Sequence, residues 1–366
     1  MRGFLTAIWV LCALSAVAQP RTSVTLTKGW EFHRGDKGAG GEWTKVEVPH
    51  DWAIYGPFDR TNDLQSVAIV QNGEREESIK TGRTGGLPYI GRGQYRLQLP
   101  IAVSGERCYT LLFDGAMSGA QVFVNGTKCG EWGYGYNSFE VDITRAAKEG
   151  DNLIEVELEN LPQSSRWYPG AGLYRNVHLI TTERVHVPVW GTQLTTPYVG
   201  ADYASVRLRT ELANLPDGDT VRMATVIRDN AGHVVASKEE TRRVHSPMPF
   251  EQHFTVERPQ LWSPESPALY TAESKIYHKG RLTDEYTTRF GIRTIEMRAD
   301  KGFFLNGKRR KFRGVCLHHD LGPLGAAVNS AAIRQRLAML RDMGCDAIRT
   351  THNMPAPELV ELCDEM

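Results

Sequence analysis

Alternating apolar and polar residues dominate the chain from about Thr22 to Thr182. Apolar residues two positions apart recur in four runs, Tyr95-Leu97-Leu99, Tyr109-Leu111-Phe113, Phe139-Val141-Ile143 and Ile154-Val156-Leu158. Alternation of this kind places one face of each strand on a core and the other in water. The pair Asn125-Gly126, directly after an alternating run, is typical of a two-residue hairpin turn. Many short strands with glycine-rich turns predict a β-sandwich or jelly roll, interrupted by a long polar loop from Gly56 to Pro88.

A second β pattern follows from about Glu183 to Phe290. Val206, Leu208 and Thr210 alternate with polar residues, and the turn at 229–232 leads into Val234. The length of this region fits an immunoglobulin-like sandwich. Since the Cys–Trp–Cys spacing of antibody domains is missing from the sequence, the prediction concerns the architecture alone.

After Gly291 the pattern changes to alternating strands and helices. The sequence predicts a hairpin at Asn306-Gly307, a buried strand over 312–317, a helix on which Ile333, Leu337 and Leu340 share a face, and a strand over 346–350. Gly344 ends the first helix, and Pro355 and Pro357 open a second one. This order is typical of a parallel α/β unit. About seventy residues make two βα units, whereas a closed barrel needs eight.

The first eighteen residues have the features of a secretory signal peptide. Arg2 precedes an apolar run from Phe4 to Val17, and Ala16-Val17-Ala18 fits a cleavage site before Gln19. The alternative, a membrane anchor, needs about 20 apolar residues. We therefore expect an exported protein, periplasmic or extracellular, without membrane insertion.

Charge and cysteine content exclude several other classes. The chain has 43 basic and 43 acidic residues, and loss of Arg2 with the leader leaves 42 against 43, which predicts no nucleic-acid partner. Five cysteines remain after Cys12, without CxxC spacing, so neither zinc nor another metal or cofactor is expected. A Cys108–Cys129 disulfide and buried free thiols both fit these positions.

Candidate chemistry lies at the ends of the two predicted parallel strands. His318-His319-Asp320 follows the first strand, and Thr351-His352-Asn353 follows the second. The active site of a (β/α)₈ barrel lies at this end of its strands. Imidazoles and amides both donate and accept hydrogen bonds, which suits sugar hydroxyls. The alternative is that the histidines satisfy buried backbone groups at the barrel rim.

Six segments resemble glycoside hydrolase family 2, and they occur in the family's order. They are Val48–Trp52, Ser165–Val177, Phe290–Arg293, Phe303–Lys308, Arg313–Val315 and Ile348–Asn353. The resemblance implies a mostly β, multidomain protein with a jelly-roll sugar-binding domain (19–182), an immunoglobulin-like β-sandwich (183–291) and the start of an incomplete TIM barrel (292–366). It also implies retaining hydrolysis by two glutamates about 5 Å apart.

The same resemblance places both glutamates at later barrel strands, so no catalytic residue is expected in this chain. The acidic residues of the last predicted helix are expected to form a solvated face; they are Glu358, Glu361, Asp364 and Glu365.

The resemblance transfers sugar-binding roles to a small set of residues. His318 matches a glycone-contacting histidine, His352 with Asn353 matches a sugar-subsite segment, and Arg349 matches an arginine that orients catalytic groups. Arg166 stands where well-known members have an aspartate; it could bind a hydroxyl or a carboxylate, or stack on the neighbouring Trp167.

Two further segments with aromatic residues have two interpretations each. Asp51 could hold hydroxyls, and Trp52 beside it could stack on a sugar or belong to the core. The loop with Trp132, Tyr134 and Tyr136 could form a glycan platform or pack as a plain turn.

We expect a hydrolase of terminal β-linked sugars in oligosaccharides or glycoconjugates, with β-galactosidase as the first choice. β-Glucuronidase and β-mannosidase are the alternatives within the family. A non-catalytic carbohydrate-binding protein is the alternative from another class, and a homo-oligomer stays open.

Overall fold

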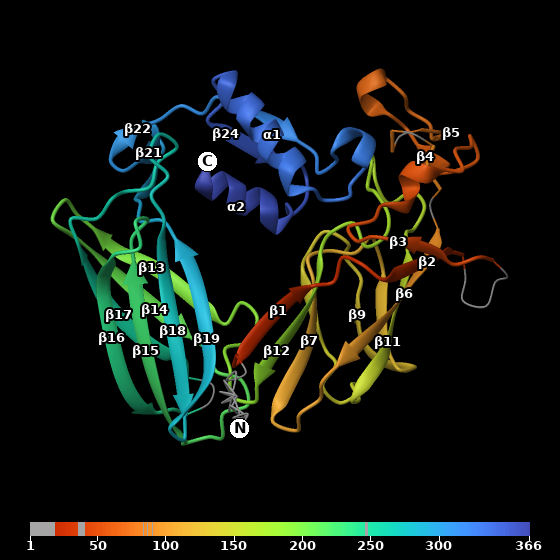
Figure 1. Cartoon of the computed structure of the whole chain (residues 1–366). Helices are drawn as coiled ribbons and strands as arrows, with labels where there is room; N and C mark the ends of the chain where they lie inside the picture. Colours follow the sequence, from red (N-terminus) through yellow and green to blue (C-terminus); the bar gives the residue numbers. More distant parts are fainter. Residues whose placement is uncertain (1–18, 36–40, 83, 86, 90, 246–247) are drawn as a thin grey trace, which may run out of the picture.

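The computed structural model describes residues 19–35, 41–82, 84–85, 87–89, 91–245 and 248–366. The predicted signal peptide, residues 1–18, lies outside the described residues. Two β-sandwiches stand side by side, and the helices α1 (Ser330–Asp342) and α2 (Pro357–Glu365) lie between them at one end (Figure 1). The prediction of a mostly β chain with few helices is confirmed.

The first sandwich packs a four-stranded sheet against a six-stranded sheet. The smaller sheet has the order β1 (Arg21–Thr25), β12 (Val177–Glu183), β7 (Arg107–Phe113) and β10 (Phe139–Asp142). The larger sheet has the order β3 (Thr44–Val46), β2 (Trp30–Arg34), β6 (Arg92–Ile101), β11 (Gly150–Glu159), β8 (Ala120–Val124) and β9 (Thr127–Trp132). All neighbouring strands in both sheets run antiparallel.

The alternation in the sequence is the physical basis of this sandwich. Inward residues such as Leu111 on β7 and Val156 on β11 are fully buried and belong to one core cluster that joins both sheets. Asn125 and Gly126 have φ angles of 51° and 79°, as a tight hairpin turn between β8 and β9 requires. The hairpin predicted at these two residues is therefore confirmed.

The polar stretch after Gly56 is more ordered than the predicted loop. It contains a small antiparallel pair, β4 (Gln65–Val67) and β5 (Ser78–Lys80), and a short 3₁₀ turn, η2 (Val70–Asn72). Its strands carry mainly exposed or half-buried residues, so they show no apolar alternation. Pairing of such strands leaves little signal in the sequence.

The second sandwich has sheets of three and four strands. One sheet has the order β13 (Thr192–Val199), β14 (Tyr203–Thr210) and β17 (Phe250–Glu257). The other has the order β16 (Val234–Arg243), β15 (Thr220–Arg228), β18 (Tyr270–His278) and β19 (Arg281–Phe290). Two clusters of buried apolar side chains fill the space between them.

The C-terminal part begins with a small antiparallel sheet and continues with a parallel pair. The small sheet contains β20 (Ile295–Arg298), β21 (Gly302–Leu305) and β22 (Lys308–Arg309). The strands β23 (Gly314–Leu317) and β24 (Ala347–Thr350) run parallel, with the 3₁₀ turn η3 (Gly322–Leu324) and α1 between them. Asn329 caps α1 through its side chain, and Gly344, at a φ of 87°, follows the end of the helix as predicted.

The prediction that the strand over 312–317 is buried is wrong. Phe312 is 58% exposed, and β23 alternates exposed and half-buried residues. Within the described residues β23 pairs with β24 alone. Ile348 of β24 packs on a core with α1 and α2, so the helices cover one face of the pair.

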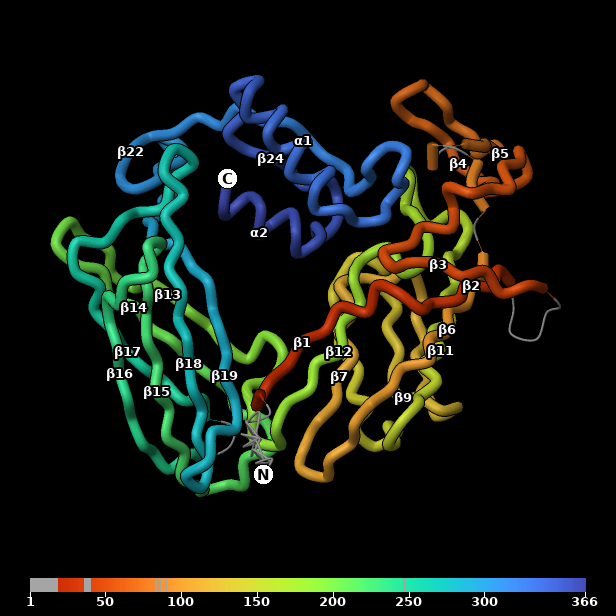
Figure 2. The backbone as a smooth tube through the Cα atoms, viewed as in Figure 1, coloured from red at the N-terminus to blue at the C-terminus, as the bar shows by residue number. Residues whose placement is uncertain are grey.

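Charged and polar contacts join the three parts of the chain. β1 lies between the two sandwiches (Figure 2), where Arg21 donates to both carboxylate oxygens of Asp284 on β19 at 2.9 and 2.8 Å. At the other end, the Trp262 indole donates to the carbonyl of Asp364 at 2.8 Å. The α/β part is thus attached to the second sandwich as well as to the first.

Candidate functional site

The parallel pairing of β23 and β24 brings the two predicted histidines together. Leu317 stands opposite Thr350 in the register, and Thr351 donates to the Leu317 carbonyl through its amide at 2.9 Å and its hydroxyl at 3.0 Å. His318 directly follows β23 and His352 lies two residues after the end of β24, and both are exposed. Their ring centroids lie 5.7 Å apart with the ring planes nearly perpendicular.

A tryptophan from the first sandwich completes this group. Trp167 lies in the segment between β11 and β12, and its ring centroid is 5.8 Å from that of His318 and 5.3 Å from that of His352. The indole N–H donates to the Tyr136 hydroxyl at 3.1 Å. We call Trp167, His318 and His352 the ring cluster. From the sequence, Trp167 was expected only as a ring on which Arg166 could stack, because nothing in the local pattern relates Trp167 to the two histidines.

His319 points away from the ring cluster and has a structural role. Its Nε2 donates to the Pro169 carbonyl at 3.0 Å, and its ring meets the edges of Tyr136 and Tyr174. Burial lowers the pKa of His319 to about 4, so its imidazole is neutral at neutral pH. This histidine ties the α/β part to the first sandwich.

Asn353 and Arg349 lie on different sides of the strand ends. Asn353 is half-buried near Tyr136, and its Nδ2 is buried without a hydrogen-bond partner among the described residues. Arg349 is exposed on β24 and donates to the Cys316 sulfur at 3.7 Å. Because Ile348 faces the helices, its neighbour Arg349 faces the opposite side of the sheet, which would be the interior of a closed barrel.

Arg166 is an exposed cation that directly precedes Trp167 in the sequence. Its side chain has no hydrogen bond, ion pair or stacking contact with the residues that the structure describes, and this includes the predicted stacking on Trp167. The guanidinium is therefore available to an anionic or hydroxyl group of a ligand.

Asp51 lies in a different place from the other predicted site residues. It is 1% exposed and accepts four hydrogen bonds, from the amides of Ala53 (3.0 Å), Ala171 (3.0 Å) and Ala326 (2.8 Å) and from the Tyr168 hydroxyl (2.6 Å). Burial raises the pKa of its carboxyl, and the four donors act in the opposite direction. This geometry argues against the predicted contact with sugar hydroxyls and makes Asp51 a junction between the first sandwich and the α/β part.

The residues around Asp51 are core residues. Trp52 is fully buried and stacks on Phe32 at 5.3 Å, in agreement with the core interpretation of this tryptophan. His50 shares a hydrogen bond of 2.7 Å with the Tyr95 hydroxyl, and burial lowers the pKa of His50 to about 4.

Arg175 is a second site residue that the sequence analysis did not single out. It is 1% exposed, and its guanidinium donates to the carbonyls of Met354 (2.8 Å) and Pro355 (3.4 Å) in the segment after His352. It also donates to the carbonyls of Asp114 and Tyr136 in the first sandwich. An arginine within the apolar run Leu173–Val177 was the available signal. Arg175 connects the His352 segment to the first sandwich.

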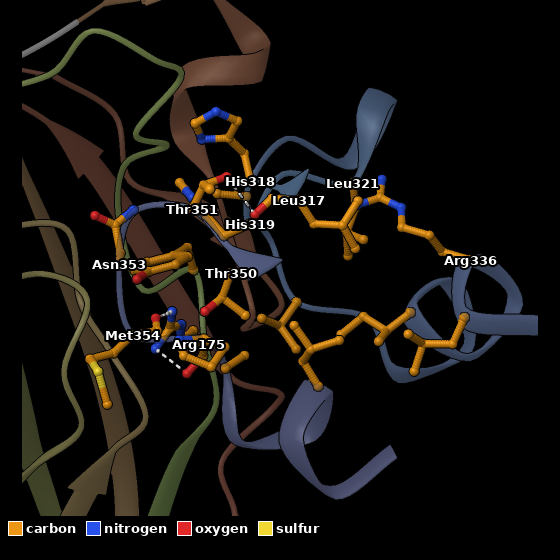
Figure 3. Close-up of a pocket in the computed structure, with 18 residues that line it drawn as sticks. Arg175, Leu317, His318, His319, Leu321, Arg336, Thr350, Thr351, Asn353 and Met354 are labelled. Atoms are coloured by element: carbon orange, nitrogen blue, oxygen red, sulfur yellow. Dashed lines mark hydrogen bonds between the residues drawn. The ribbon is translucent and has the colours of Figure 1, made fainter. Parts of the chain in front are cut away.

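A small cavity lies at the strand ends, and His318 of the ring cluster is one of its lining residues (Figure 3). Its volume is about 40 Å³, and it is lined by residues that include Arg175, Leu317, His319, Leu321 and Asn353. A water molecule takes about 30 Å³ of liquid, so the cavity has room for water and none for a sugar ring. This cavity is therefore not the place where a sugar would bind.

The acidic residues of α2 form the expected solvated face only in part: Glu361 and Glu365 are exposed, whereas Asp364 and Glu358 are half-buried. Glu358 faces the first sandwich, where its carboxylate accepts from the Asn176 amide, and burial raises its pKa. Glu365 accepts from Arg289 at 2.9 Å and from Arg334 at 3.1 Å. Both residues hold α2 in place through these contacts.

Other chemistry is limited in the described part of the chain. Cys108 and Cys129 are half-buried free thiols, so the disulfide alternative is not formed. The described residues contain no group of three or more histidine, cysteine or acidic side chains that could hold a metal ion. Among the described helices, none has the length and apolar character needed to cross a bilayer.

Comparison with known proteins gives consistent matches over almost the whole chain. Residues 186–293 match glycosyl hydrolases family 2, and residues 295–366 match the TIM barrel domain of that family. A β-galactosidase of Bacteroides ovatus is 38% identical over 97% of this chain and 41% of its own length. A putative β-glucuronidase of Formosa agariphila is 33% identical over 88% of this chain and 29% of its own length.

A solved structure agrees with these matches. A glycosyl hydrolase family 2 member from Bacteroides cellulosilyticus superposes with a TM-score of 0.84 at 33% identity, over 93% of this chain and 44% of the other. The chain thus spans less than half the length of these three relatives.

Proposed function

The chain belongs to glycosyl hydrolases family 2, and on that premise we propose that it supplies the glycone-binding part of a retaining β-glycosidase, with β-galactosidase as its activity. The ring cluster carries this proposal. Two exposed imidazoles and an indole from three distant segments meet at the carboxyl ends of parallel strands, where barrel enzymes bind substrates. The 38% identical relative is a β-galactosidase, which supports that choice of sugar.

A β-glucuronidase is the second candidate, and Arg166 favours it. The guanidinium is exposed next to Trp167 in the sequence and has no acidic partner among the described residues. Its planar fork suits the carboxylate of a uronic acid. Several relatives are also described as β-glucuronidases.

We place the catalytic pair of carboxylates outside the described residues. A retaining pair would stand about 5 Å apart at the sugar site. The acidic residues of α2 are engaged elsewhere, with Glu358 on Asn176 and Glu365 on two arginines. The role of Arg349 as an orienting residue depends on such a pair and is part of this proposal.

Sugar binding by the full chain tests the proposal. Titration with methyl β-D-galactopyranoside and methyl β-D-glucopyranosiduronate, followed by NMR, should show binding that falls at least about tenfold in His318→Ala and His352→Ala, the equivalent of 1.4 kcal/mol. His253→Ala is the matched control, because His253 is exposed on the second sandwich. Unchanged binding in both site variants would refute the glycone site. Arg166→Ala should weaken the glucuronide alone if the uronate alternative holds, and an equal loss for both sugars would remove it.

Turnover and processing give two further tests. The pure chain should not hydrolyse aryl β-glycosides, and turnover would overturn the placement of the carboxylates. We also propose export with cleavage before Gln19, so the N-terminal residue of the protein from its source should be Gln19. An N-terminus at Met1 would contradict export by this route.

A further inference from the structure

Trp167 is the part of the ring cluster for which the first sandwich is needed. The two imidazoles come from the α/β part, whereas Trp167 reaches them from the segment between β11 and β12. It lies 5.8 Å from His318 and 5.3 Å from His352, measured between ring centroids, so one indole contacts both histidines. It is also partly exposed, unlike the core residues Trp30 and Trp52, which are fully buried.

Because the polar N–H of Trp167 is already hydrogen-bonded, the apolar surface of its indole is the part that can contact a ligand. The indole has one donor, and that N–H is already bonded to the Tyr136 hydroxyl at 3.1 Å. Tyr136 is itself buried against Tyr174 and fixed by the first sandwich, so this bond holds the orientation of the indole ring. The exposed side of Trp167 therefore offers carbon surface beside two polar imidazoles.

We propose that Trp167 is a sugar-contacting and positioning residue: its indole packs on the C–H surface of a terminal pyranose and holds His318 and His352 at the spacing at which they bind hydroxyls of that ring. The proposal rests on the proposed glycone site and extends it to the first sandwich. A pyranose has both an apolar C–H surface and hydroxyls at its edge, which matches an indole flanked by two imidazoles.

The other tryptophans with described contacts do not compete for this role. Trp43 has Arg96 over its ring at 4.1 Å, Trp132 stacks on Phe139 at 5.9 Å between ring centroids, and the Trp262 indole donates to the carbonyl of Asp364 on α2. None of these three has a described contact with His318 or His352. Trp167 is therefore the tryptophan whose replacement should change both the histidines and the bound sugar.

The experiment compares Trp167→Leu and Trp167→Phe in the full chain. The Cε1–H signals of His318 and His352, assigned by NMR with the histidine variants, report the ring current of the neighbouring indole. In Trp167→Leu both signals should move and the affinity for methyl β-D-galactopyranoside should fall about tenfold, since aromatic contacts are worth roughly one such factor. Trp167→Phe keeps an aromatic face and should retain most of the affinity.

Two tyrosine variants separate contact from general damage. Tyr136→Phe removes the oxygen that holds the indole N–H and that also interacts with the Asn353 side chain, so the His318 signal, which is remote from Asn353 in the sequence, is the one that reports the orientation of the indole and should shift. Tyr134→Phe is the control, because Tyr134 is 50% exposed and contacts the ring of Tyr136 instead of Trp167.

The outcomes distinguish this proposal from the one on which it rests. Binding that is the same in wild type, Trp167→Leu and Trp167→Phe would overturn the contact role of Trp167 and leave the glycone site intact. Histidine signals that stay in place in Trp167→Leu would overturn the positioning role. Wild-type protein that binds neither glycoside would overturn the proposed function and the sugar contact together, whereas the histidine signals would still decide whether the indole positions the rings.

Discussion

Replacement of Asp51 by alanine should loosen the junction between the first sandwich and the α/β part. Asp51 is 1% exposed, and its two oxygens accept hydrogen bonds from three amides and one hydroxyl. A hydrogen bond to a charged group contributes about 1.5–3 kcal/mol, and a buried donor left unsatisfied costs about 1–3 kcal/mol. The four bonds share one carboxylate and are not additive, so we expect a total loss of about 3–5 kcal/mol.

The isosteric change Asp51→Asn should cost less. Its remaining oxygen can still accept from Ala53 and Ala171, whereas its amide nitrogen would face the N–H of Ala326, a donor against a donor. We expect about 1–3 kcal/mol for this variant. Asp59→Asn is the matched control, because Asp59 accepts bonds only within an exposed turn, and its stability should not change measurably.

Hydrogen exchange locates the effect more directly than global unfolding in a chain of several parts. In Asp51→Ala, peptides that contain Ala326 and Ala171 should lose protection, and the urea midpoint of the transition that includes the α/β part should fall. Protection of the second sandwich, for example over β15, should stay at the wild-type level. Unchanged exchange at Ala326 together with an unchanged midpoint would refute the idea that Asp51 holds this junction.

Three further predictions concern other buried groups. Because the pKa values of His50 and His319 are lowered to about 4, the unfolded chain binds more protons below pH 6.5, so stability should fall as the pH drops from about 6.5 to 4, by up to about 3 kcal/mol for each histidine; His319→Gln should flatten that curve in pH-dependent urea unfolding, and an unchanged curve would contradict the buried neutral imidazole. Asp284→Asn should destabilise the contact between the sandwiches by about 3–5 kcal/mol, because Asp284 is fully buried against Arg21 and the Val187 amide; a thermal unfolding curve that matches wild type would contradict this. Arg175→Met should raise hydrogen exchange over 352–356, because the carbonyls of Met354 and Pro355 lose their donor, and equal exchange in the two proteins would show that this segment is held by other contacts.

Local patterns predicted the strands and helices well, because each depends on neighbours in the sequence. Alternation at Tyr95 and Leu97 marks β6, and both side chains are buried as the pattern requires. The spacing of Ile333 and Leu337 with Gly344 after them marks α1 and its end. The β4–β5 pair escaped prediction because it has no buried apolar face, its one buried residue being the polar Gln65. The exposed position of Phe312 depends on which strands cover β23.

The candidate site could be predicted only in part, because its remaining members are determined by tertiary contacts. His318 and His352 follow parallel strands, so their proximity follows from the topology. Asp51 was assigned to sugar binding because a carboxylate suits hydroxyls, yet one of its donors, Ala326, is 275 residues away in the chain. No local sequence pattern predicts a hydrogen-bond donor so distant in the chain. Trp167 was missed as a member of the ring cluster for the same reason.

Through these contacts the first sandwich holds the segments that follow β23 and β24 in place. Asp51 fixes the segment after β23 through Ala326, Arg175 fixes the segment after β24 through Met354, and Trp167 contacts both histidines that those segments carry. Two exposed side chains on short parallel strands would otherwise sample many rotamers, and a site that binds hydroxyls needs them fixed. Each of the three residues comes from the first sandwich. The geometry of a sugar site on the α/β part therefore depends on the first sandwich, although the strands that carry the site, β23 and β24, belong to the α/β part.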